Sequence, residues 1–148
     1  MTSALTGPFR SLLFAPGNHP RRVEKALGLS ADVVILDLED AVAIAEKVAT
    51  RSIVVDALQG ERTGLGYVRV NAYDTDFCCG DLLVVVAEGV DGIVLPKVET
   101  PAQLQSVDWV GGQLEREKGL PEGGIDIIPI IETGKGVASV HDIASTST

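Results

Sequence analysis

Cysteines, basic residues and long apolar runs are all scarce in this sequence. The chain has two cysteines, Cys78 and Cys79, and they are adjacent. Neighbouring cysteines rarely bridge each other, because a disulfide needs Cα atoms about 4.4–6.8 Å apart with suitably oriented Cβ atoms. Nothing in the sequence resembles a disulfide framework or a zinc site, so we expect a protein of the reducing cytoplasm.

Membranes and nucleic acids are disfavoured as partners. No apolar run approaches the ~20 residues that cross a bilayer, and residues 1–10 lack the basic start and apolar core of a secretory signal. The chain has 12 basic and 21 acidic residues, which gives a formal net charge of −9. A net charge of this sign argues against nucleic acid or an anionic membrane as the main partner.

Five short and almost continuously apolar runs are the strongest pattern in the sequence. They cover residues 10–15, 33–38, 67–71, 92–96 and 125–131. Continuous rather than alternating apolar runs are typical of parallel strands that are covered on both faces. The chain has 148 residues, 45% of them hydrophobic and 22% charged, as in an ordinary globular domain. One α/β domain is therefore predicted.

Helix-length segments separate the predicted strands. The clearest covers residues 43–58, and another begins at residues 100–101, where a capping residue precedes proline. A third follows the turn at residues 17–18. One apolar face of the first segment would hold Ile44, Val48, Val55 and Leu58.

The spacing of the strands leaves two architectures open. Their starts lie roughly 29 residues apart on average, so eight such units would take about 230 residues, close to the ~250 of a (β/α)₈ barrel. Five units occupy this chain. The pattern therefore indicates either a five-stranded doubly wound domain or the first five units of a barrel.

Carboxylates gather where the second predicted strand ends. Asp37, Glu39 and Asp40 follow a fully apolar run within four residues. Like charges this close raise one another's pKa and destabilise the segment unless a cation lies nearby. Asp40 could instead be a helix N-cap. A metal ion, an arginine or a lysine is expected beside this cluster.

The neighbouring strand ends supply the opposite charges. Arg69 lies inside the third apolar run, and an arginine there is rarely buried without a partner. Its planar guanidinium suits a bidentate carboxylate, from a substrate or from the protein. Lys97 follows the fourth strand, and Glu132 follows the fifth. The carboxyl ends of parallel strands meet at one edge, so these groups should converge, and a carboxylate such as Glu132 is a natural ligand for Mg²⁺.

A second candidate binding region follows the first strand. The turn Pro16-Gly17-Asn18 leads into a helix whose first turns hold Arg21, Arg22 and Lys25. Free amides at a helix start with cations beside them could hold a phosphate or carboxylate. A solvated basic helix face is the alternative interpretation.

Five sequence segments carry a family resemblance. They read RSLLFAPGN at 10–18, VILDLEDAV at 34–42, VRVNA at 68–72, GIVLPKVET at 92–100 and IIPIIET at 127–133. In this order and spacing they resemble the citrate lyase β-subunit branch of the HpcH/HpaI aldolase/citrate lyase family. The resemblance implies a (β/α)₈ TIM barrel that uses Mg²⁺ to make or break carbon–carbon bonds. It also implies a CoA thioester substrate of the citryl-CoA, malyl-CoA or citramalyl-CoA type, cleaved to a 2-oxo acid and an acyl-CoA.

The resemblance also implies roles for single residues. Arg69 corresponds to the arginine that holds the substrate carboxylate, and Glu132 to the first protein ligand of the metal. Asp37, Glu39 and Asp40 correspond to the acidic cluster of the catalytic site. Residues 16–18 and Arg22 would face the CoA portion, and Lys97 would contribute to substrate binding.

Residues 1–148 are expected to form the N-terminal part of one such barrel domain, ending before the sixth strand. The family's second metal carboxylate belongs to that sixth strand, and full-length members are expected to be homo-oligomers, trimers or hexamers. A truncated, inactive or partner-dependent barrel fragment is therefore the alternative hypothesis.

A phosphorylated receiver domain is a further alternative of a different class. A five-unit strand–helix chain with acidic loops has its size. That fold needs an aspartate after strand three, where this chain has Asn71, and a lysine after strand five, whereas Lys97 follows strand four.

Overall fold

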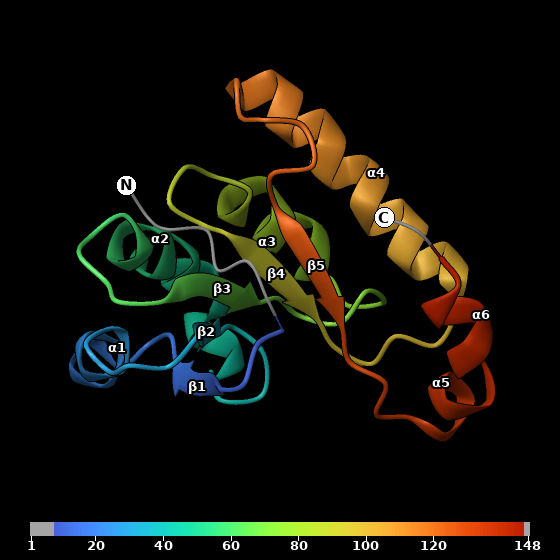
Figure 1. Cartoon of the computed structure of the whole chain (residues 1–148), viewed down its shortest axis with the longest axis horizontal. Coiled ribbons are helices and arrows are strands. Elements are labelled where there is room, and N and C mark those ends of the chain that lie inside the picture. The colour runs from blue at the N-terminus through green and yellow to red at the C-terminus, as the bar shows by residue number, and fades with distance from the viewer. Residues whose placement is uncertain (1–7, 147–148) are drawn as a thin grey trace.

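The computed structural model describes residues 8–146, which form a five-stranded parallel sheet with helices packed against it (Figure 1). The residues before position 8, used above to argue against a secretory signal, lie outside the described range. None of the helices in the described part combines the length and hydropathy needed to cross a membrane. The strands are β1 Leu12–Pro16, β2 Val33–Asp37, β3 Leu65–Arg69, β4 Gly92–Leu95 and β5 Asp126–Pro129.

The helices follow the strands in the expected alternation. They are α1 Pro20–Leu27, α2 Lys47–Leu58, α3 Cys78–Val85, α4 Pro101–Lys118, α5 Gly134–Ala138 and α6 Val140–Ala144, and a short 3₁₀ helix, Ile44–Glu46, precedes α2. Helix α4 begins with a capping box between Thr100 and Gln103, with proline in its first turn, and ends at Gly119 in the left-handed conformation. The predicted start of this helix is confirmed.

The strand order distinguishes the architectures that the sequence left open. The five strands lie side by side in the order β1-β2-β3-β4-β5, all parallel. Doubly wound sheets, including the receiver fold, reverse their order at a switch point and carry helices on both faces. Here the order never reverses, so the doubly wound and receiver alternatives are wrong.

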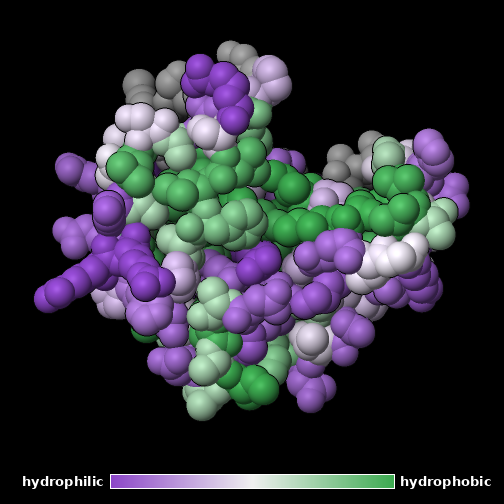
Figure 2. Space-filling view, turned by 90° about the horizontal axis from the view of Figure 1, so that it is seen from below, coloured by the Kyte–Doolittle hydropathy of each residue, from purple (hydrophilic) through white to green (hydrophobic). Residues whose placement is uncertain are grey.

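The two faces of the sheet pack against different parts of the chain. One face is lined by Val33, Ile35, Tyr67 and Val94, and no helix residue belongs to this cluster. Leu12 and Phe14 share this face because they pair in register with Val33 and Ile35, and both are exposed. We call it the inner face. Figure 2 looks at the molecule from the side of β1 and shows a continuous band of hydrophobic residues between hydrophilic ones.

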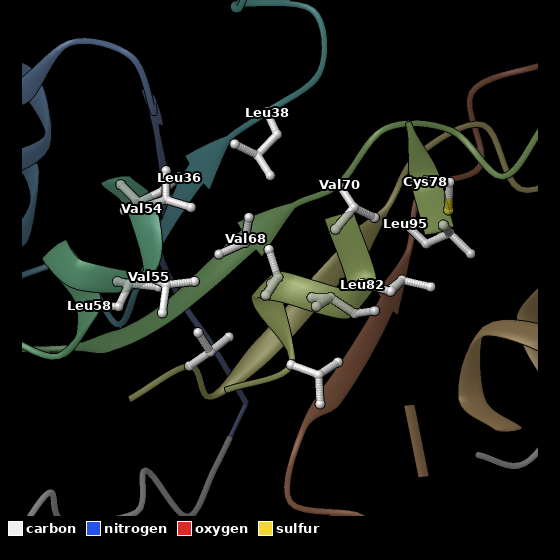
Figure 3. Packing of buried hydrophobic residues seen from close by; sticks show 14 of the residues in the cluster. Leu36, Leu38, Val54, Val55, Leu58, Val68, Val70, Cys78, Leu82 and Leu95 are labelled. Carbon is white, nitrogen blue, oxygen red and sulfur yellow. The ribbon is translucent and has the colours of Figure 1, made fainter. Parts of the chain in front are cut away.

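The opposite face packs against the helices and holds the main core. Leu36, Val68 and Leu95 of the sheet meet Leu58 of α2 and Leu82 of α3, all of them buried (Figure 3). Burying an aliphatic side chain of this size contributes about 1.5–3 kcal/mol relative to exposure. This layer therefore fixes the sheet, and with it the positions of the strand ends.

The predicted apolar face of the segment 43–58 is wrong in part. Val55 and Leu58 are buried, but Ile44 and Val48 are exposed. Ile44 lies in the 3₁₀ turn before α2, outside the period of that helix, and the side of α2 that faces the sheet carries Lys47, Thr50, Val54 and Leu58. A buried lysine on that side has consequences for the functional site.

Candidate functional site

The last residues of β2 and β3 form the centre of the site. Asp37 and Arg69 pair in register, which places both side chains on the inner face. The guanidinium donates from Nε to Asp37 Oδ1 and from Nη2 to Oδ2, each at 2.7 Å. It also lies over the Phe14 ring, 5.0 Å from the centroid. Arg69 therefore has one fixed orientation, as the paired strand ends require.

The protonation states of this pair follow from its contacts. Burial alone would raise the pKa of Asp37, but the hydrogen bonds from Arg69 and from the amides of Glu39 and Ala41 outweigh it and lower the pKa. The hydrogen bonds with Asp37 raise the pKa of Arg69 against the opposing effect of burial. Both groups are charged at neutral pH.

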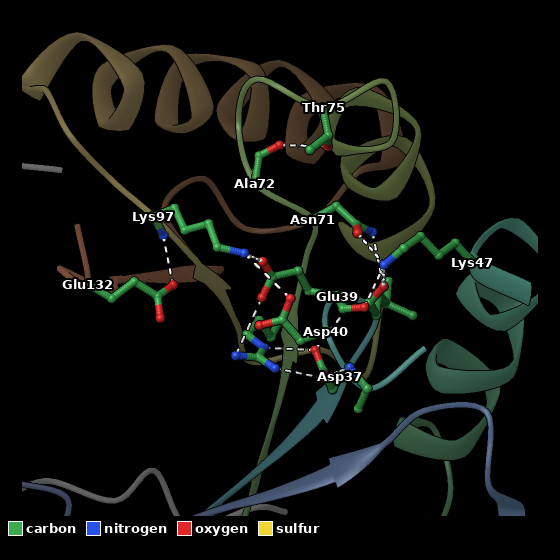
Figure 4. Close-up of polar contacts among 12 residues, drawn as sticks. Asp37, Glu39, Asp40, Lys47, Asn71, Ala72, Thr75, Lys97 and Glu132 are labelled. Atoms are coloured by element: carbon green, nitrogen blue, oxygen red, sulfur yellow. Dashed lines mark hydrogen bonds and ion pairs between the residues drawn. The ribbon is translucent and has the colours of Figure 1, made fainter. Parts of the chain in front are cut away.

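The acidic segment after β2 meets two cations, as its composition predicted (Figure 4). Glu39 is buried, and its carboxylate bonds to the Lys97 ammonium through Oε1. Its Oε2 lies 3.5 Å from Arg69 Nη1 and has no hydrogen-bond partner. Asp40 is exposed and lies 3.5 Å from Lys97 Nζ. The hydrogen bond with Glu39 raises the pKa of Lys97.

Lys97 also connects β4 with β5 through its backbone. Its φ of 54° is in the left-handed region, which costs a residue with a side chain about 1–3 kcal/mol. In this conformation its amide donates to Glu132 Oε1 at 3.1 Å, while its side chain reaches Glu39. Glu132 follows β5 and is exposed at the same edge of the sheet. The predicted convergence of Asp37, Glu39, Asp40, Arg69, Lys97 and Glu132 is seen in the structure.

The turn after β1 borders the centre of the site but differs from it in character. A Cβ on Gly17 would lie 2.6 Å from Val54 Cγ1 and 2.8 Å from the Asp37 carbonyl oxygen, so only glycine fits there. The Asn18 side chain donates to Glu46 at 3.0 Å. Arg22 is exposed on α1 and is not brought into the acidic cluster, whose cations are Arg69 and Lys97.

A pocket of about 200 Å³ opens between the ends of β1, β2 and β3 on this side. Its walls combine one apolar ring, small residues and the Asp37–Arg69 pair. Arg69 has five N–H groups, and Asp37 takes two of them, so others remain for a bound carboxylate. The lining residues are Phe14, Ala15, Pro16, Asp37, Ala41 and Arg69.

Four residues around the site were missed by sequence reasoning. Lys47 is buried and donates to the carbonyl oxygens of the acidic segment, and its third acceptor is Asn71. Asn71 in turn bonds to the buried Asp81, which pairs with Arg51. The spacing of Lys47 from Thr50, Val54 and Leu58 matches a buried helix stripe, and that signal could have identified it.

The described residues supply few side chains for a metal ion. Within residues 8–146, no group of three or more histidine, cysteine, aspartate or glutamate side chains could hold a metal ion. Glu132 is exposed with one carboxylate oxygen bonded only to an amide, so it fits one ligand position. Asp37 and Glu39 are occupied by Arg69 and Lys97. These residues therefore do not form a complete Mg²⁺ site.

Comparison with known proteins places this arrangement in a family. The profile of the HpcH/HpaI aldolase/citrate lyase family matches residues 10–148, and the chain belongs to that family. It is 39% identical over 140 residues to the citrate lyase subunit beta of Leuconostoc mesenteroides subsp. cremoris, a match covering 93% of this chain and 46% of the relative. It is 38% identical over 145 residues to the L-malyl-CoA/beta-methylmalyl-CoA lyase of Cereibacter sphaeroides, covering 95% and 45%.

The fold agrees with a solved structure of the same kind. The citrate lyase beta subunit complexed with oxaloacetate and magnesium from M. tuberculosis superposes with a TM-score of 0.70 at 35% identity, over 92% of this chain and 53% of that one. The chain thus spans about half the length of the relatives it matches. The two curated relatives named above are a citrate lyase subunit and a malyl-CoA lyase.

Proposed function

We propose that the chain contributes to a Mg²⁺-dependent lyase that cleaves a 3-hydroxyacyl-CoA thioester into a 2-oxo acid and an acyl-CoA. The observation that carries this proposal is the placement of Arg69, which is held by two hydrogen bonds to Asp37 and lines a pocket of about 200 Å³. Its remaining N–H groups can donate to a ligand. A guanidinium fixed in this way binds a carboxylate in one orientation. The named relatives act on malyl-CoA or belong to citrate lyase, so citryl-CoA, malyl-CoA and citramalyl-CoA are the candidate substrates.

The reaction determines what the residues would do. The carbon–carbon bond breaks, the hydroxyl loses its proton, and the electron pair passes to the acyl-CoA, which takes up a proton as its enolate collapses. Arg69 would bind the carboxylate of the departing 2-oxo acid, and Asp37 would keep the guanidinium in place. Glu39 and Asp40 would complete the catalytic cluster, with Lys97 balancing their charge and contacting the substrate. A bound Mg²⁺ supplies Lewis-acid polarisation in reactions of this class.

Glu132 is our candidate for one ligand of that Mg²⁺, because it is an exposed carboxylate at the same edge as Arg69. The turn at residues 16–18 and Arg22 would face the CoA portion. Pro16 lines the pocket, which supports this for the start of the turn. Arg22 lies apart from the acidic cluster, as expected of a group that meets a distant part of a long substrate.

We also propose that the sheet is part of the wall of a (β/α)₈ barrel, with residues 1–148 in its N-terminal part. The unreversed strand order and the absence of helix residues from the inner-face cluster support this. In such a barrel the inner face would be covered by strands on the far side. Assembly into a homo-oligomer remains part of the same proposal.

The test is cleavage of citryl-CoA, malyl-CoA and citramalyl-CoA with and without Mg²⁺, followed by detection of the 2-oxo acid as its phenylhydrazone. Mg²⁺ titration of the wild type is compared with Glu132→Gln and with Glu122→Gln, an exposed glutamate in the α4–β5 loop, as the matched control. We expect weaker Mg²⁺ binding only in Glu132→Gln. Equal affinities of the wild type and Glu132→Gln would remove Glu132 from the ligand set.

A second candidate is a partner-dependent or inactive barrel fragment, supported by the open edges of the sheet. Among residues 8–146, β1 and β5 each pair on one side only, and Leu12 and Phe14 are exposed on the inner face. Unpaired strand edges beside exposed apolar side chains favour association. We therefore expect the isolated chain to aggregate or to be poorly stable, with little activity. A monodisperse monomer in sedimentation velocity that cleaves one of these thioesters would rule this candidate out.

A further inference from the structure

Lys47 of α2 has surroundings that are unusual for a lysine. It is 7% exposed, and its ammonium donates to the carbonyl oxygens of Leu38 at 2.9 Å and Glu39 at 2.5 Å and to Asn71 Oδ1 at 2.6 Å. All three acceptors are neutral. A buried charge is costly unless it is paired and hydrogen-bonded, so an apolar residue would be the less costly choice at a purely structural position.

A chain of hydrogen bonds through Asn71 joins Lys47 to the buried Asp81. The Asn71 amide donates from Nδ2 to Asp81 Oδ2 at 2.7 Å and to the Leu38 carbonyl at 3.1 Å. Asp81 also accepts from the backbone amide of Asn71 at 2.8 Å and from Arg51 Nε at 2.8 Å. The series Arg51–Asp81–Asn71–Lys47 therefore ends on the backbone of the acidic segment.

This series holds the acidic segment from the side opposite to the cations of the site. Asp37 accepts the amides of Glu39 and Ala41 at 2.9 and 3.0 Å, and the Glu39 side chain turns toward Lys97. In Figure 4, Lys47 and Lys97 approach Glu39 from opposite sides. The backbone around Glu39 is thus fixed by Lys47, and its carboxylate by Lys97.

We propose that Lys47 and Asn71 are positioning residues, which hold the segment after β2 so that Asp37 orients Arg69 and Glu39 stays beside it. They touch no substrate and act through the backbone. The part that this positioning plays in catalysis rests on the proposed function, but the positioning itself can be measured separately. The amide hydrogens of Glu39 and Ala41, both bonded to Asp37, report how often the segment opens.

The experiment compares Lys47→Met with Lys118→Met by amide hydrogen exchange in the full chain. Lys118 is the matched control, because it too donates to two backbone carbonyls, those of Leu83 and Val86, each at 2.6 Å, and neither belongs to the site. We expect exchange at Glu39 and Ala41 to become faster by about tenfold or more in Lys47→Met alone. Amides of the sheet core, such as that of Ile93, should keep their protection in both variants.

A second readout links the inference to binding. With Mg²⁺ present, the Kd for oxaloacetate should rise by about tenfold in Lys47→Met and stay within about twofold of wild type in Lys118→Met. Should wild type bind no oxaloacetate, the proposed function fails for this chain while hydrogen exchange still decides the positioning. Unchanged exchange at Glu39 and Ala41 in Lys47→Met, or an equal change in Lys118→Met, overturns the inference.

A second substitution, Lys47→Gln, covers the case in which Lys47→Met does not fold. Lys47→Gln keeps an N–H donor one bond closer to the backbone, so it should retain part of the protection at Glu39 and Ala41. If Lys47→Met does not fold, the same comparison is made between Lys47→Gln and Lys118→Gln. Faster exchange at the two amides in Lys47→Gln alone supports positioning, and the absence of a difference between the two variants contradicts it.

Discussion

Replacing Arg69 by methionine should lower the free energy of unfolding by more than the loss of an exposed ion pair would. Methionine keeps the apolar stem of the side chain but leaves the Asp37 carboxylate, which is 2% exposed, without its bidentate partner. Removing one partner of a buried pair costs about 3–5 kcal/mol. Asp37 keeps two amide donors, and the Arg69 side chain is 15% exposed, so we expect the lower end, about 3 kcal/mol.

The pH dependence of this penalty follows from the lowered pKa of Asp37. A carboxylate whose folded-state pKa is lowered stabilises the fold above its unfolded value of about 3.9, and this contribution is lost as the pH falls through the folded value. The difference between wild type and Arg69→Met should therefore be full at pH 7. It should shrink below about pH 4, because a protonated Asp37 no longer needs the arginine.

The assay is urea unfolding of wild type, Arg69→Met, Asp37→Asn and the double variant, at pH 7 and at pH 3.5. In a thermal scan, 3 kcal/mol corresponds to a lower Tm by roughly 6–12 °C for a chain of about this length. The matched control is Arg116→Met, which breaks the Arg116–Glu122 ion pair, in which both side chains are more than half exposed. An Arg69–Asp37 coupling below about 0.5 kcal/mol, or equal losses in Arg69→Met and Arg116→Met, would refute the reasoning.

Two further predictions concern stability. Tyr67→Phe should cost about 1–2 kcal/mol at pH 7, because the buried hydroxyl donates to Asp126 at 2.8 Å. Burial raises the pKa of Tyr67, so the stability that Tyr67 contributes is intact below about pH 10 and is lost as the pH rises further. The difference between the urea midpoints at pH 9 and pH 11 should therefore be smaller in Tyr67→Phe than in wild type. Tyr73→Phe, the exposed control, should behave like wild type. Gly111→Ala should raise the free energy of unfolding by about 0.5–1 kcal/mol, since a Cβ there meets nothing within 4 Å, whereas Gly17→Ala should lower it by about 1–3 kcal/mol. Equal effects of the two in urea unfolding would contradict the packing described.

Much of the site could be predicted because it depends on strand ends. In a parallel sheet, a residue that directly follows an apolar run comes to the carboxyl edge whatever the loops do. Lys97 and Glu132 needed no more than this rule, and Asp37 and Arg69, the last residues of β2 and β3, pair in register. The need for a cation beside the acidic segment was likewise set by Coulomb repulsion among its carboxylates.

What could not be predicted depends on hydrogen bonds to the backbone and on helical phase. Lys47 binds carbonyl oxygens, which leave no trace in the sequence, so its role was not visible from charge pairing. Ile44 was placed on the wrong side because it belongs to the 3₁₀ turn before α2, which breaks the helical period on which the prediction relied. The stacking of Arg69 on Phe14 needed the register of β1, which no motif encodes.

The charges of the cluster indicate how it can bind an anion at all. Asp37, Glu39 and Asp40 are opposed by Arg69 and Lys97, so the cluster carries no excess of positive charge. Such a cluster in a chain of net charge −9 cannot attract an anionic thioester by its overall field. Affinity must then come from the directed N–H groups of Arg69 and from a cation near Glu132, the carboxylate at this edge without an ion-pair partner among the described residues. This is why orientation of Arg69, rather than the amount of positive charge, is the property on which the proposed activity depends.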